Sequence, residues 1–109
     1  MDIRAAYGGR SAAEVLFPAT VASSPHYFVG SRTHAMHEAF VANSSAGPVE
    51  IVDNVGLAPR VPVNAGDSIF VKGEMVHDKG RIPVVHWTHH DPSEHHEDGF
   101  IQFRGRVYA

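Results

Sequence analysis

The chain has 109 residues, enough for one domain with a modest core, and its 43% hydrophobic and 19% charged content is that of an ordinary globular protein. No apolar run is long enough to cross a membrane, and the absence of cysteine excludes disulfides and thiolate metal ligands. The net charge of −3 counts against tight, unassisted binding of a polyanion.

The first half of the chain predicts short strands separated by turns. Residues 1–13 are expected to be a polar lead-in to a single domain over 14–109. A strand is expected over 14–21, where β-branched and aromatic residues dominate and Pro18 indicates an edge or a bulge. Residues 26–29 either prolong this strand or begin a loop.

A hairpin is expected next, with strands over 37–42 and 49–52. The polar loop 43–48 joins them. Because side chains alternate along a strand, His37 and Glu38 are expected on opposite faces.

The second half predicts three more strands. Alternation is clearest over 68–76, where Gly73 indicates a bulge or a bend. A strand over 82–89 is expected to place His86 and Thr88 on one face and to end before Pro92. Residues 100–108 are expected to form the last strand, interrupted by Gly105.

No stretch shows a helical stripe of apolar residues over three turns. The pattern therefore predicts an all-β domain, and its size and mid-strand glycine favour a small OB-like barrel of five or six antiparallel strands. An open sandwich is the alternative.

The densest chemistry lies in residues 86–98. Five of the nine histidines and four carboxylates fall in this window. Imidazole and carboxylate groups bind divalent metals and exchange protons near neutral pH. The window is interpreted as a metal site; a solvated loop whose histidines have no role is the alternative.

The candidate ligands follow from the turn expected at Pro92, which lets the chain reverse direction. His86, His90 and His96 are the first choice, followed by Asp91 and His89. Ligands of this type suit a divalent transition metal such as Zn, Mn, Ni, Fe or Cu. His37 is a candidate fourth ligand or general base.

Some of these residues also have structural interpretations. His86, next to two valines, could be a buried, hydrogen-bonded imidazole. Trp87 is interpreted as a core residue rather than a stacking platform. Glu74 is a candidate catalytic carboxylate, although a solvated position on its strand is the stronger interpretation.

The run His86-Trp87-Thr88-His89-His90-Asp91-Pro92 resembles the signature of a bacterial domain family of unknown function, family 3465. Further matches extend from His37 to the end of the chain: Phe40, Ala58-Pro59-Arg60, Gly66-Asp67, Gly73-Glu74, His96, Gly99, Ile101, Gly105 and Tyr108. Phe100 stands where the family tends to have Trp. The resemblance implies a compact OB-like barrel, often in exported proteins, with no established activity.

The compartment stays open. The first residues do not look like a signal peptide, so the chain as written is expected in the cytoplasm, or in the periplasm or outside the cell if a leader has been removed.

Two functions from different classes follow. The first is a metal-dependent phosphodiester hydrolase acting on single- or double-stranded nucleic acid, with phosphate held by arginines, of which Arg60, Arg104 and Arg106 are the candidates. The second is a non-catalytic module that binds metal or nucleic acid. The sequence leaves the metal, the substrate, the existence of catalysis and the oligomeric state open.

Overall fold

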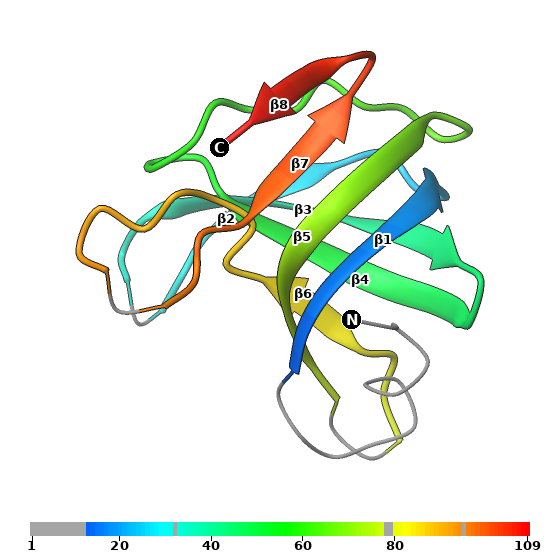
Figure 1. Ribbon diagram of the computed structural model, residues 1–109, viewed down its shortest axis with the longest axis horizontal. Helices are drawn as coiled ribbons and strands as arrows, with labels where there is room; N and C mark the ends of the chain where they lie inside the picture. The colour runs from blue at the N-terminus through cyan, green and yellow to red at the C-terminus, as the bar shows by residue number, and fades with distance from the viewer. Residues whose placement is uncertain (1–12, 32, 78–79, 95) are drawn as a thin grey trace.

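The computed structural model describes residues 13–31, 33–77, 80–94 and 96–109, so most of the expected lead-in and His95 lie outside the described residues (Figure 1). The strands are β1 (Ala13–Val21), β2 (His26–Val29), β3 (Met36–Ser44), β4 (Gly47–Asn54), β5 (Ser68–Val76), β6 (Val84–His86), β7 (Phe100–Phe103) and β8 (Arg106–Tyr108). The described ranges contain no helix that could cross a membrane.

Five of these strands close into a barrel in the order β1-β3-β4-β6-β5, and β5 pairs back onto β1. The all-β small barrel is thus confirmed. Its expected wholly antiparallel arrangement is wrong at one point, because β4 and β6 run parallel. Strand direction cannot alternate around a closed ring of five, so at least one neighbouring pair must be parallel.

Period-two alternation fills the barrel with apolar side chains. In β5 the buried residues Ile69, Val71 and Met75 alternate with residues that are at least partly exposed. Gly73 continues the pairing with β1 without a bulge. A Cβ there would lie 2.5 Å from the carbonyl oxygen of His86, so this glycine allows β6 to approach closely.

The strand expected over 82–89 is shorter, because β6 ends at His86. Trp87 follows with a φ of 55°, a left-handed conformation that breaks the extended chain. The expectation that Thr88 shares a face with His86 is therefore wrong. Thr88 is fully buried, whereas His86 remains partly exposed.

The expected last strand is in fact a hairpin. Arg104 and Gly105 both have positive φ, 51° and 77°, and form the two-residue turn between β7 and β8. Positive φ at both positions suits the right-handed twist of a hairpin. Residues 26–29, left open above, form the separate strand β2, which pairs with β3.

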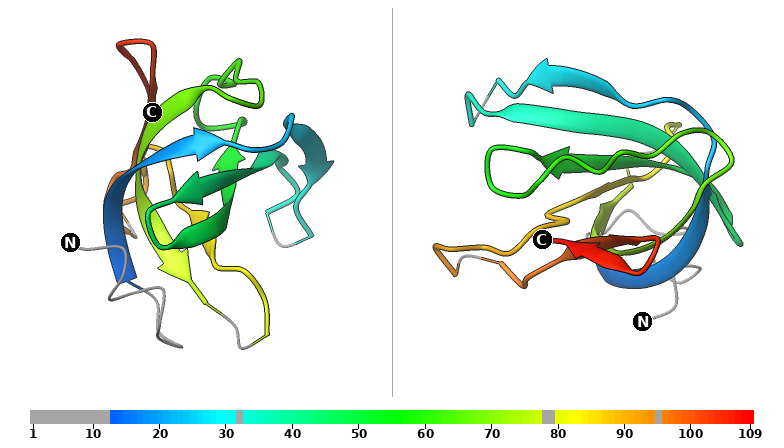
Figure 2. Two further views of the ribbon diagram at one scale, coloured as in Figure 1. Left: turned by 90° about the vertical axis from the view of Figure 1, so that its right-hand side faces the viewer. Right: turned by 90° about the horizontal axis from the view of Figure 1, so that it is seen from above.

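Three connections lie at one end of the barrel (Figures 1 and 2). They follow β2, β4 and β6 and are coloured cyan, green and orange. The orange connection is the His-rich segment. Residues far apart in the sequence are therefore brought together at this end.

Candidate functional site

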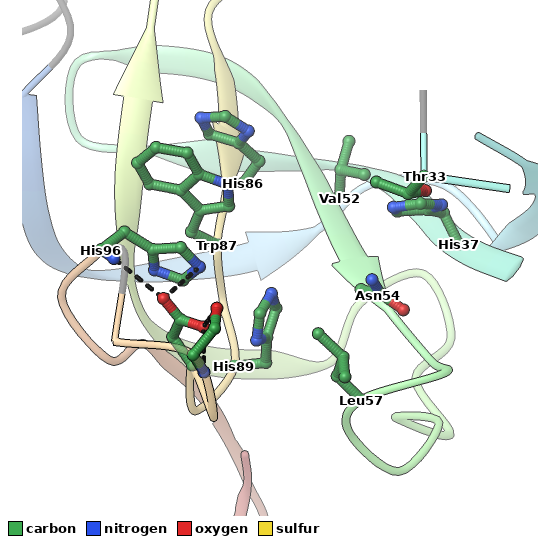
Figure 3. Close-up of a pocket in the computed structure, with 11 residues that line it drawn as sticks. Thr33, His37, Val52, Asn54, Leu57, His86, Trp87, His89 and His96 are labelled. Carbon is green, nitrogen blue, oxygen red and sulfur yellow. Dashed lines mark hydrogen bonds and ion pairs between the residues drawn. The ribbon is translucent and has the colours of Figure 1, made fainter. Parts of the chain in front are cut away.

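A pocket of about 400 Å³ opens between these three connections (Figure 3). Four histidines line it, together with one tryptophan and small polar and apolar residues. The lining residues are Thr33, His37, Val52, Asn54, Leu57, His86, Trp87, His89, Asp91, Ser93 and His96.

Trp87 forms one wall of the pocket, held between two imidazoles. Its indole stacks on His86 at a centroid distance of 4.6 Å and on His96 at 4.2 Å. Figure 3 shows the two imidazoles on opposite sides of the indole. Trp87 is 37% exposed, so it belongs to the site wall and not to the core, contrary to the interpretation from sequence.

Glu74 fixes the orientation of His86. Glu74 on β5 is the register partner of His86 on β6. Its Oε1 accepts a hydrogen bond from His86 Nε2 at 2.9 Å. Glu74 does not itself line the pocket. The structure therefore gives this carboxylate an indirect position, behind the imidazole.

The opposite wall contains His37 on β3. Its Nδ1 lies 2.9 Å from the carbonyl oxygen of Ala35, which can only accept, so Nδ1 carries the proton. In the neutral ring, Nε2 then has a free lone pair. Gly30 packs against this ring so closely that a Cβ would lie 2.7 Å from its Cε1.

His89 and His96 are held in the same way. The Nδ1 of His89 donates to the carbonyl of His90 at 2.7 Å, and the Nδ1 of His96 donates to the carbonyl of Glu97 at 2.9 Å. Their ring centroids are 5.2 Å apart. In the neutral form of each ring, Nε2 then carries a lone pair.

Asp91 organises the loop that carries His96. Its Oδ1 accepts hydrogen bonds from the backbone N–H and the hydroxyl of Ser93, at 2.9 and 2.7 Å, and its Oδ2 accepts the N–H of His96 at 2.8 Å. The Oδ2 also lies 3.7 Å from His96 Nε2. Asp91 therefore has a structural function that is independent of any metal.

His90 lies apart from this group. It hydrogen-bonds through Nδ1 to Asp98 Oδ2 at 2.8 Å and is exposed, outside the pocket lining. The Asp91 N–H and His90 together hold the pKa of Asp98 below its usual range. The first-choice set of His86, His90 and His96 is therefore not brought to one point, whereas His37, His86, His89, Asp91 and His96 share the pocket.

The three candidate phosphate-binding arginines also lie outside the pocket lining. Arg60 stacks over the Tyr27 ring at 4.3 Å, Arg104 over Phe103 at 5.0 Å and Arg106 over Tyr108 at 4.8 Å.

The sequence did not lead us to expect two buried carboxyls on the strands β3 and β4. Glu38 and Asp53 pair across β3 and β4, and both are fully buried. Burial raises the pKa of Glu38, and it raises the pKa of Asp53 to about 7. Period-two alternation along β4 could have predicted the burial of Asp53, because Asp53 follows the buried residues Val49 and Ile51 on the same face.

The pocket is lined by imidazole and carboxylate groups, which are donor types that transition metals bind. Imidazoles that donate one ring N–H to a carbonyl or carboxylate are typical of metal ligands. Within the described ranges, however, no three His, Asp or Glu side chains are grouped closely enough to hold one ion as they stand. Ring rotations would be needed to form a shared coordination sphere.

Comparison with curated proteins gives no match, and comparison with solved structures gives none either. A family model matches residues 27–109, which include the whole pocket and every barrel strand except β1. The chain therefore belongs to the family described as "Protein of unknown function (DUF3465)".

Proposed function

We propose that this domain binds a divalent transition metal in the histidine-lined pocket and hydrolyses phosphodiester bonds of nucleic acid. One observation carries the proposal: four pocket imidazoles each have one ring nitrogen held by an oxygen acceptor. In the neutral rings this leaves a lone pair on the Nε2 of His37, His89 and His96 and on the Nδ1 of His86.

His89 and His96 are the proposed ligand pair. Their rings are 5.2 Å apart and come from the two ends of one loop, and the rings would have to rotate to direct both lone pairs at one ion. A bound transition metal would supply Lewis-acid polarisation of a phosphoryl oxygen. Asp91, next to His96, is the proposed third ligand or a support for the loop.

His37 is the proposed general base. Its Nδ1–H is fixed on Ala35, so Nε2 can accept a proton from the water that attacks phosphorus. The attacking oxygen forms the new P–O bond while the ester P–O bond breaks, and the leaving oxygen takes a proton from solvent. Asn54 can position a substrate oxygen, because its Oδ1 accepts the Gly56 N–H and its amide N–H groups remain donors.

A non-catalytic binding module is the second candidate. The specific observation in its favour is the structural function of Asp91, whose two oxygens already accept hydrogen bonds within the loop. In that case the histidines bind metal or nucleic acid without bond cleavage.

The single tryptophan allows a direct test of metal binding. Trp87 contacts both His86 and His96, so its fluorescence should change on titration of the chelator-treated protein with Zn²⁺, Ni²⁺ or Cu²⁺. His96→Ala and His89→Ala should each weaken the metal affinity at least about tenfold. His77→Ala is the matched control, because His77 lies outside the pocket lining and should leave the affinity unchanged.

Cleavage of plasmid DNA and of a single-stranded oligonucleotide then tests catalysis. Chelation should abolish cleavage, and the metal that binds should restore it. His37→Ala should lower turnover more than metal affinity if His37 is the base. Metal binding without cleavage of either substrate by any of these ions would reject the hydrolase and favour the binding module.

A further inference from the structure

Beside the pocket, the outer face of the sheet continues as a surface of aromatic rings. In the strand register, His37 pairs with Phe28 on one side and Asn54 on the other. Directly paired residues project from the same face of a sheet. Phe28 and the pocket residue His37 therefore lie on one continuous surface that crosses β2, β3 and β4.

The rings of this surface contact one another. Phe28 stacks on His37 at a centroid distance of 5.4 Å and on His26 at 5.9 Å. All four residues of β2 are exposed, and Phe28 is 40% exposed. Phe28 therefore presents ring surface to solvent within a row of three rings, and such a row can contact a further planar group.

The charge of this part of the chain differs from that of the whole protein. Between Glu14 and Glu38 the sequence contains no carboxylate, but it contains one arginine and three histidines. Four of the twelve carboxylates instead fall within residues 91–98. The carboxylate of β3, Glu38, is fully buried. A polyanion would therefore meet less repulsion over β2 and the start of β3 than over the His-rich segment.

We propose that a single strand of nucleic acid lies across β2 and β3, with a base stacked on Phe28 and the backbone directed toward the pocket. This inference rests on the proposed function for the class of substrate and adds its strandedness. In a duplex the faces of the bases are covered by their neighbours, so a ring platform selects unpaired bases. Of the two strands, β3 belongs to the barrel and is the second in the ring, and OB-like barrels bind oligonucleotides over their second and third strands.

The test measures binding without cleavage. The chelator-treated full chain is titrated into fluorescein-labelled single-stranded DNA, single-stranded RNA and duplex DNA of equal length, and anisotropy is recorded. The wild type should bind a single strand at least about tenfold more tightly than the duplex. Comparison of the two single-stranded probes shows whether the protein prefers DNA or RNA.

Three variants assign the binding to the ring. Phe28→Ala and Phe28→Leu should each weaken binding roughly tenfold, and Phe28→Tyr should retain it, because stacking requires the ring and not apolar volume. Val107→Ala on β8 is the control, since Val107 is 54% exposed on another part of the surface and should bind as the wild type does.

Equal affinity of the wild type for duplex and single strand would overturn the inference, and so would full retention of binding by Phe28→Leu. Absence of binding to any strand would also overturn it. The proposed function is tested separately, by the metal titration that Trp87 fluorescence reports and by cleavage with the metal-loaded protein.

Discussion

The buried carboxyl of Asp53 accepts a hydrogen bond from Thr88. The Thr88 hydroxyl has one proton but lies 3.1 Å from both the Val52 carbonyl oxygen and Asp53 Oδ1. The hydrogen bond from Thr88 favours the charged carboxylate and lowers the pKa of Asp53. Burial has the larger effect and raises this pKa to about 7.

This pKa predicts how stability depends on pH. Because the folded pKa of Asp53 is raised from 3.8 to about 7, its protonated form favours the folded state below the lower value, and this stabilisation is lost as pH rises toward 7. Asp53→Asn keeps a neutral side chain at all pH values. The advantage of the variant over wild type in urea unfolding should therefore grow by roughly 2–3 kcal/mol from about pH 5 to about pH 8.

Asp98→Asn is the control for this prediction. The folded pKa of Asp98 is lowered, so its charged form is the favoured one and the variant should gain nothing as pH rises. A constant difference between Asp53→Asn and wild type over this pH range would mean that Asp53 is ionised in the fold throughout.

At the scale of elements, composition located the His-rich segment but could not say which histidines enter the pocket. That selection depends on contacts with residues that are not part of the histidine pattern. Glycine at position 99 donates its N–H to the carbonyl of His89 at 2.9 Å, and Lys72 on β5 holds Glu97 at 3.4 Å. The left-handed φ of Trp87 also had no signal in the sequence, since a bulky residue rarely adopts it.

Replacement of this glycine tests how the segment is held. A Cβ at position 99 would lie 2.1 Å from the Trp87 carbonyl oxygen and 2.5 Å from that of Lys72, and backbone atoms cannot move as a side chain can. Gly99→Ala should therefore destabilise the protein by about 2 kcal/mol or more and shift the fluorescence of Trp87.

Gly56→Ala is the matched control in another loop. The new methyl would meet two side-chain atoms, the Oδ1 of Asn54 at 3.1 Å and the Cβ of Ala35 at 3.7 Å, and no backbone atom, so the loss of stability should be small. Equal stability of Gly99→Ala and wild type would show that the segment closes differently from the arrangement described above.

At the scale of the molecule, alternation predicted the all-β domain because one face of each strand fills a single core, whereas the size and the mid-strand glycine favoured a barrel over an open sandwich. The core unites residues from β1, β3, β4, β5, β6, β7 and β8. The parallel pair β4–β6 was missed because it follows from ring closure and not from any local pattern. The strand β6 closes the ring and ends next to Trp87, which forms one wall of the pocket. The free energy of ligand binding in the pocket should therefore stabilise the whole barrel.

Metal binding should therefore raise the melting temperature of the entire domain. A ligand that binds only the folded state adds about 2.7 kcal/mol at a concentration of 100 times its Kd, which corresponds to roughly 10–20 °C for a domain of this size. Far-UV circular dichroism and Trp87 fluorescence should report one shared transition that Zn²⁺ shifts upward, in wild type and in His77→Ala. His96→Ala should lose most of the shift, and Mg²⁺, which prefers oxygen ligands, should cause none in any variant. An equal Zn²⁺ shift in His96→Ala would place the stabilising ion elsewhere on the chain, and separate transitions for the two signals would show that the pocket melts independently of the barrel.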